Sequence, residues 1–154
     1  MVSPEVLRRY PFFGFMNHDQ LREVAIITDE MDADADTTLF ESGAEADTFY
    51  LLRDGNVELH YVVTDERGME KRQDFLVGMI NPGEVVGISA LISPYKYTAM
   101  AVVTEPSELL RVDAKRLRDL CDTDPTLSAA WHQRMAESTM ERLHSTRVQL
   151  LAAT

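Results

Sequence analysis

The sequence predicts a mainly β protein with flanking helices: a jelly-roll barrel that follows short N-terminal helices and precedes a long C-terminal helix. Three observations predict this class. Apolar and polar residues alternate between residues 31 and 112, turn signals recur there at short intervals, and a helical period of hydrophobicity occurs on both sides. A chain of 154 residues can bury one core, so we expect residues 1–154 to form a single domain.

Residues 1–30 are expected to form short helices. Their apolar residues recur three or four positions apart, and a Pro-Phe-Phe-Gly break at residues 11–14 divides them. Asn17 is a residue type that caps a helix by accepting a hydrogen bond from a backbone N–H, so the second helix should begin beside it. Such short helices are marginal alone, and we expect them to cover a larger element.

Residues 31–112 are expected to form the strands. Val57, Leu59 and Tyr61 alternate with polar residues, as in a strand with one buried face. Turn signals recur at roughly 8–14 residues, which is typical of a sandwich or barrel, and about 80 residues suit a double-stranded β-helix of the jelly-roll, cupin-like type. The turn signals are Ser42-Gly43, Asp54-Gly55, Arg67-Gly68, Asn81-Pro82-Gly83 and Glu105-Pro106.

Residues 113–154 are expected to form two helices. The first covers residues 114–121, and Asp124 with Pro125 caps and starts the second, which can run to about residue 151. The apolar stripe of this second helix is broader than contact with one barrel requires. We expect its inner part to pack on the barrel and its outer part, past Ala136, to pair with its mate in a homodimer. The stripe comprises Leu127, Trp131, Met135, Ala136, Met140, Leu143, Leu150 and Leu151.

Charge and hydropathy exclude two kinds of partner. The formal net charge is −11, and residues 17–66 hold 14 acidic residues against Arg22 and Arg53. Because nucleic-acid affinity comes largely from cations that neutralise phosphates, we expect no direct nucleic-acid binding. No apolar run approaches the roughly 18 residues that a membrane span needs, so we expect no membrane association and a cytoplasmic location.

An acidic run imitates a calcium site. Asp32, Asp34 and Asp36 resemble the start of a calcium-binding loop, but Thr37 and Gly43 stand where such a loop requires glycine and glutamate. The alternation of Asp with Ala fits an exposed strand face better, and we expect no calcium there.

Other signatures of metal or covalent chemistry are weak. Cys121 is the only cysteine, so it can form no intrachain disulfide and no thiolate cluster. Ser89 has no histidine near it in sequence to act as a base. We therefore expect no metal, no cofactor and no catalytic residue, which makes the protein non-enzymatic. The four histidines lie far apart, without the paired spacing of a zinc site: His18, His60, His132 and His144.

A series of motifs follows the predicted strands and turns. They are Glu41-Ser42-Gly43-Ala44, Asp47, Phe49-Tyr50-Leu51-Leu52, Asp54-Gly55, the run Pro-Gly-Glu-Val-Val-Gly-Ile-Ser-Ala-Leu at residues 82–91, and Tyr97-Thr98-Ala99. Together these motifs resemble the cyclic nucleotide-binding domain family, of the catabolite activator protein and kinase A regulatory-subunit type. The resemblance covers nearly the whole chain and implies a ligand-sensing regulatory domain in signal transduction.

The resemblance also implies a binding site. In that family the segment after the Pro-Gly turn is a phosphate cassette, a strand and one helical turn whose N–H groups face the cyclic phosphate. The closing helix of the family covers the ligand, which adds Met135, Glu141 and Arg142 as further candidates. The implied ligand-binding residues are Gly87, Ile88, Ser89, Ala90, Leu91, Tyr97, Thr98 and Ala99.

Two positions depart from the family pattern. Ile88 stands where the family has a glutamate that binds the ribose hydroxyl, and Tyr97 stands where it has an arginine that binds the phosphate. Two lost hydrogen bonds to charged groups remove roughly 3–6 kcal/mol, or about 10² to 10⁴ in affinity. We therefore expect a sensor of a small, flat or less charged molecule that acts through a separate output protein. The alternative is a ligand-free dimerisation or docking module on the same fold.

Overall fold

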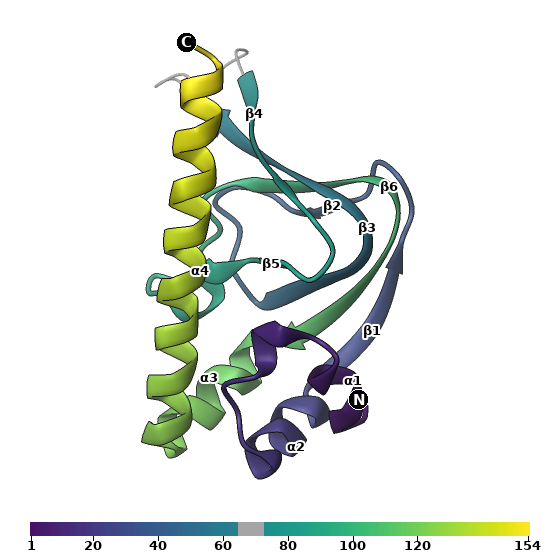
Figure 1. Ribbon diagram of the computed structural model, residues 1–154, viewed down its shortest axis with the longest axis vertical. Coiled ribbons are helices and arrows are strands. Elements are labelled where there is room, and N and C mark those ends of the chain that lie inside the picture. The colour runs from purple at the N-terminus through teal and green to yellow at the C-terminus, as the bar shows by residue number, and fades with distance from the viewer. Residues whose placement is uncertain (65–72) are drawn as a thin grey trace.

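The computed structural model describes residues 1–64 and 73–154. Within these residues the strands are antiparallel and helices flank them at both ends of the chain, so the predicted fold class is confirmed (Figure 1). In chain order the elements are α1 (Pro4–Arg8), η1 (Pro11–Phe13), α2 (His18–Ile26), β1 (Thr28–Ala33), β2 (Thr38–Phe40), β3 (Thr48–Val63), β4 (Gln73–Ile80), β5 (Val85–Val86), η2 (Ile88–Leu91), β6 (Met100–Asp113), α3 (Ala114–Thr123) and α4 (Pro125–Ala152). The first strand thus begins at Thr28, slightly before the expected boundary.

The two long strands β3 and β6 organise the sheet. They pair with each other, β6 also pairs with β1 and β2, and β3 also pairs with β4 and β5. The strands curl around an interior, with α1, α2 and α3 gathered at one end and α4 running along one side (Figure 1). The consecutive residues Leu109 and Leu110 are both fully buried, because successive side chains of a strand point to opposite faces and each of these two faces is covered by its own core cluster.

Two of the turn predictions are wrong. Strand β3 continues through Asp54-Gly55, and β6 continues through Glu105-Pro106, with shifts in their pairing register at that place. Gly55 has φ +107°, and a Cβ atom there would lie 2.0 Å from Ser107 Oγ, so only glycine fits. The N–H of Asn56 donates to Ser107 Oγ at 3.1 Å. These residues therefore form bulges at which two paired strands bend together instead of reversing.

The remaining turn predictions have different outcomes. Ser42-Gly43 and Asn81-Pro82-Gly83 do lie at turns, with φ +86° at Gly43 and +89° at Gly83. The turn expected at Arg67-Gly68 lies outside the described residues.

Local capping chemistry sets the helix starts. Asn17 accepts a hydrogen bond from the Gln20 N–H at 2.9 Å, while the Gln20 side chain accepts from the Asn17 N–H at 3.0 Å. Asp124 accepts from the Leu127 N–H at 3.1 Å and so caps α4. Both predicted caps are confirmed. Helix α3 ends at Thr123, directly before this cap.

An aromatic cluster joins the N-terminal helices to α4. Trp131 is fully buried, and its ring centroid lies 5.3 to 6.2 Å from the rings of Phe12, Phe13, Phe15 and Phe49. The N-terminal segment therefore covers the end of the barrel, where its aromatic side chains meet the barrel and α4.

The apolar stripe of α4 divides in two, as expected. Its inner residues Leu127, Trp131 and Met135 are buried, and Ser138 is the last buried residue of the helix. The apolar residues of the stripe beyond Ser138 are exposed: 72% for Met140, 48% for Leu143, 66% for Leu150 and 74% for Leu151.

Candidate functional site

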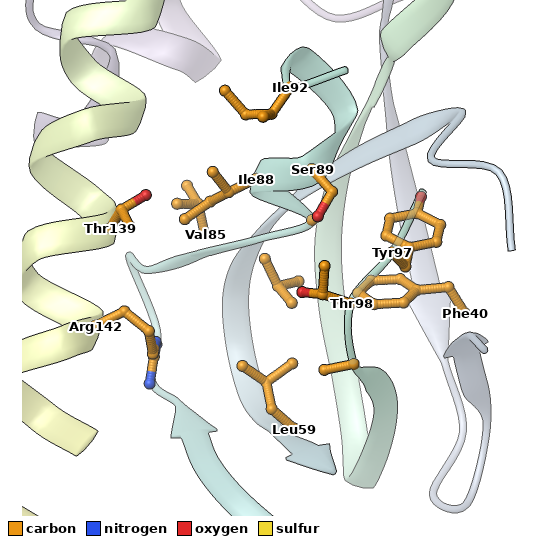
Figure 2. Close-up of a pocket in the computed structure, with 13 residues that line it drawn as sticks. Phe40, Leu59, Val85, Ile88, Ser89, Ile92, Tyr97, Thr98, Thr139 and Arg142 are labelled. Atoms are coloured by element: carbon orange, nitrogen blue, oxygen red, sulfur yellow. The ribbon is translucent and has the colours of Figure 1, made fainter. Parts of the chain in front are cut away.

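A cavity of about 310 Å³ lies between η2, the strands and α4 (Figure 2). Most of its lining is apolar, which is typical of a site for a small organic ligand. The lining residues are Phe40, Leu59, Val85, Val86, Gly87, Ile88, Ser89, Ile92, Tyr97, Thr98, Ala99, Thr139 and Arg142.

The structure places the residues of the predicted cassette in two environments. Ala90 and Leu91 do not line the cavity, because η2 turns both side chains into the main core, where they are 0% and 4% exposed. The cavity wall includes the other six: Gly87, Ile88, Ser89, Tyr97, Thr98 and Ala99.

Gly87 permits the sharp turn from β5 into η2. Its φ is +94°, a conformation that other residues rarely adopt. A Cβ atom there would lie 3.1 Å from the Thr48 carbonyl oxygen and 3.4 Å from Tyr97 Cε1. The backbone of the cassette therefore approaches β3 closely, and a side chain at this position would be strained by the positive φ and crowded by Thr48.

Tyr97 forms a wall of the cavity with its ring, while its hydroxyl is engaged elsewhere. Figure 2 shows the ring stacked on that of Phe40. The ring centroids lie 3.7 Å apart, and the planes are within 9° of parallel. The hydroxyl donates to the Thr48 carbonyl oxygen at 2.6 Å and accepts from the Thr48 N–H at 3.2 Å. Burial raises the pKa of Tyr97 well above its usual value, so the hydroxyl stays protonated.

The polar part of the lining is small. Ser89, Thr98 and Thr139 contribute hydroxyl groups, and Arg142 is the one charged side chain among the described residues that line the cavity. Lys96, which adjoins Tyr97 in sequence, is exposed and not part of the wall. No acidic residue lines the cavity, within the described part of the chain, so nothing there reproduces the ribose-binding carboxylate of the family pattern.

Of the three candidates on the closing helix, Arg142 alone lines this cavity. Met135 is buried in the core, and Glu141 lines a separate small recess beside α4. Sequence reasoning missed Thr139, although it lies three residues before Arg142 and hence on the same helix face. Phe40 was also missed, because it comes from the short strand β2 and meets Tyr97 only through the tertiary fold.

Arg118 of α3 anchors the cassette from behind. Its Nη1 donates to the carbonyl oxygens of Ala90 at 2.6 Å and Ala46 at 3.2 Å, and its guanidinium lies 4.3 Å from the centre of the Tyr95 ring. The sequence offered no signal for this role, since an arginine on an amphipathic helix is ordinarily expected to face solvent. It holds η2 and the following loop against the helix.

The other candidates for chemistry stay apart from this cavity. Within residues 1–64 and 73–154, His, Cys, Asp and Glu side chains form no group of three that could hold a metal ion. His60 contacts Glu58 at 3.0 Å on β3. Burial raises the pKa of Cys121 to about 11, so its thiol is protonated and a poor nucleophile. The described helices include none that is long and apolar enough to cross a membrane.

The acidic run at residues 32–36 differs from its prediction. Strand β1 ends at Ala33, so the expected strand face extends no further than Asp32. The chain then turns, with φ +70° at Asp36, whose N–H donates to the Val103 carbonyl oxygen at 2.7 Å. A short polar side chain such as Asp tolerates this left-handed conformation.

Comparison with known proteins gives a consistent result. The family model described as cyclic nucleotide-binding domain matches residues 30–124. A solved structure from Geobacter metallireducens, described as a cyclic nucleotide-binding protein, is 32% identical, with a TM-score of 0.81 over 94% of this chain and 100% of that one. No curated protein matches the chain.

More distant structures share the fold. A cyclic nucleotide-binding domain from Methylobacillus flagellatus is 17% identical, with a TM-score of 0.75 over 97% of this chain and 81% of that one. The sensor domain of the transcriptional regulator DNR from Pseudomonas aeruginosa is 23% identical, with a TM-score of 0.66 over 88% of this chain and 91% of that one.

Proposed function

Because the chain belongs to the cyclic nucleotide-binding domain family, we propose that it is a non-enzymatic regulatory domain that senses a small ligand in the cavity between η2 and α4. One observation supports this most strongly. The cassette turn at Gly87 retains the close backbone approach that the family pattern requires, and it borders a cavity large enough for a ligand. What has changed is the chemistry of the wall and not its architecture.

The changed wall disfavours tight binding of cyclic AMP and cyclic GMP. Ile88 offers the ribose no acceptor, and the Tyr97 hydroxyl is already bonded to Thr48, so it offers the phosphate no donor. The two missing interactions correspond to roughly 3–6 kcal/mol. The stacked rings of Phe40 and Tyr97 instead present an apolar surface, which suits a flat or less charged molecule.

Isothermal titration calorimetry with cyclic AMP and cyclic GMP tests this proposal. We expect the wild type to bind both nucleotides weakly or not at all, with dissociation constants no tighter than micromolar. The double variant Ile88→Glu, Tyr97→Arg should bind more tightly, because it restores both charged groups beside an intact turn. Lys96→Arg is a matched control, since it changes an adjacent exposed cation outside the cavity. Submicromolar binding by the wild type would overturn the claim of weak cyclic nucleotide binding.

The exposed end of α4 supports a second part of the proposal, a homodimer. Met140, Leu143 and Leu150 leave apolar side chains in water, which a mate helix would cover. If α4 can adopt two positions and the ligand binds one of them more tightly, ligand binding would shift the contact between the two α4 helices of the dimer. That shift would signal to a separate output protein. With a net charge of −11, that output is expected to be protein and not nucleic acid.

Light scattering tests the dimer. We expect the wild type to exceed the 17.4 kDa of one chain at tens of micromolar, and the Leu143→Asp, Leu150→Asp variant to run as one chain. A wild type that also runs as a monomer would rule the dimer out. If the wild type dimerises but a thermal-shift panel of nucleotides and metabolites finds no ligand, the ligand-free docking module becomes the better interpretation.

A further inference from the structure

Arg142 faces the cavity from the closing helix. Figure 2 shows Thr139 and Arg142 on α4 along one side of the cavity, across from Phe40 and Tyr97. The Arg142 side chain is 25% exposed, so it lies mostly within the protein. The cavity thus has a positive charge on one side and an aromatic wall on the other.

Strand β4 leaves room for this guanidinium. Gly78 lies within β4, two residues before its end, and a Cβ atom there would come 3.1 Å from Arg142 Nη1. Its φ is not in the left-handed region, so the backbone does not require glycine at this position. Glycine inside a strand weakens it and often marks a close approach of another group. Gly78 adjoins a shift in the pairing register of β3 and β4, and the atom nearest to its missing side chain is Arg142 Nη1.

The present partners of Arg142 hold it loosely. Nη1 donates to the Met79 carbonyl oxygen at 3.3 Å, and Nη2 lies 3.7 Å from Glu84 Oε2. Glu84 is 44% exposed and accepts from the Asn81 N–H through its other oxygen, so it is not committed to Arg142. An ion pair as long as this one, with a partly exposed carboxylate, contributes little, and a guanidinium has five N–H donors. Much of its hydrogen-bonding capacity is therefore available to a ligand.

We propose that the cavity binds a flat, amphipathic monoanion and that Arg142 binds its anionic group, a carboxylate or sulfonate. The apolar body then lies against Ile88 and the Phe40–Tyr97 stack. A fork of N–H donors suits a planar or multi-oxygen anion, and an apolar surrounding strengthens the attraction. The inference rests on the proposed function, because it takes the cavity to be the ligand site. It moves the anion-binding group from the cassette to α4, so ligand charge acts directly on the helix.

Two fluorescent probes with the same ring system test this assignment. 8-Anilinonaphthalene-1-sulfonate has one sulfonate, and N-phenyl-1-naphthylamine is the same molecule without it. Arg142→Gln should weaken binding of the sulfonate about tenfold or more and that of the neutral probe less than about twofold. Arg142→Lys should fall between, because an ammonium lacks the fork. Arg147→Gln, an exposed site on the same helix, makes the same change in net charge and should affect neither probe.

A further variant separates this inference from the function beneath it. Ser89→Leu adds bulk to the cavity wall and should weaken both probes. If Ser89→Leu leaves both unchanged, or the wild type binds neither, the cavity is not the ligand site and both proposals fail. If Ser89→Leu weakens both probes but Arg142→Gln weakens the sulfonate no more than the neutral probe, or no more than Arg147→Gln does, the assignment to Arg142 is wrong while the site stands. Thermal melts of each variant confirm that it is folded.

Discussion

The hydroxyl of Tyr97 can be removed while its ring stays in place. In the wild type the Tyr97 hydroxyl lies 3.2 Å from the Thr48 nitrogen and 2.6 Å from the Thr48 carbonyl oxygen. Tyr97→Phe keeps the stack on Phe40 but removes this hydrogen-bond partner from both backbone groups. Leaving such half-buried groups unpaired costs about 1–3 kcal/mol of unfolding free energy. For a chain of this length about 1 kcal/mol shifts Tm by roughly 2–4 °C, so Tm should fall by roughly 2–12 °C.

Thermal unfolding followed by circular dichroism at pH 7 measures this loss, at one protein concentration for all variants. Tyr61→Phe is the matched control, because Tyr61 lies on β3 with 54% of its surface exposed. It should change the unfolding free energy by less than about 0.5 kcal/mol. Equal losses in the two variants, or none in Tyr97→Phe, would refute the hydrogen bonds to Thr48. Probe binding to the cavity should be unchanged, since the hydroxyl does not serve the ligand.

The same variant has a signature at alkaline pH. Burial raises the pKa of Tyr97 above the ordinary 10.0, so the folded state keeps a proton that the unfolded state loses as the pH passes about 10. Ionisation of Tyr97 therefore favours the unfolded wild type above that pH, and Tyr97→Phe lacks this contribution. The Tm difference between wild type and variant should narrow above pH 10. A gap that stays constant there would contradict the burial of this hydroxyl.

Three other predictions concern Gly55, Asp124 and Cys121. Gly55→Ala places a Cβ atom 2.0 Å from Ser107 Oγ at φ +107° and should cost about 2–5 kcal/mol in urea unfolding; a wild-type midpoint would contradict the shared bend. Asp124→Ala removes the cap on the Leu127 N–H and should cost about 1 kcal/mol in the same assay, and no loss would show that the cap is dispensable. Cys121, with its pKa raised to about 11, should react with Ellman's reagent at pH 8 far more slowly in the native protein than in urea, and equal rates would show an exposed thiolate.

Sequence predicted best where the cause is local. The caps at Asn17 and Asp124 depend on hydrogen bonds three residues away, which a sequence displays directly. The bend at Gly55 was mistaken for a turn because Asp-Gly has the same local preference in a bulge as in a hairpin. What distinguishes the two is Ser107 on the facing strand, and that contact exists only after the strands pair.

The candidate site follows the same division. Gly87 was identified through the resemblance of its segment to the family's cassette, and the turn that it permits is a property of consecutive residues. The orientation of the Tyr97 hydroxyl depends on Thr48, which lies 49 residues away in the chain. The stack on Phe40 and the approach of Arg142 likewise join segments that only the tertiary fold brings together.

The burial of α4 ends well before the helix does, so a small tilt of the helix would have a larger effect at its outer end. If Ser138, its last buried residue, is the fulcrum of such a tilt, Arg142 lies one turn beyond the fulcrum and Leu151 lies near the C-terminal end of the helix. At 1.5 Å per residue these two positions lie about 6 Å and about 20 Å from the fulcrum. A tilt of about 10° moves Arg142 by about 1 Å and Leu151 by about 3 Å. Such a tilt would therefore move the end of the helix that the proposed mate covers roughly three times as far as it moves Arg142 at the cavity.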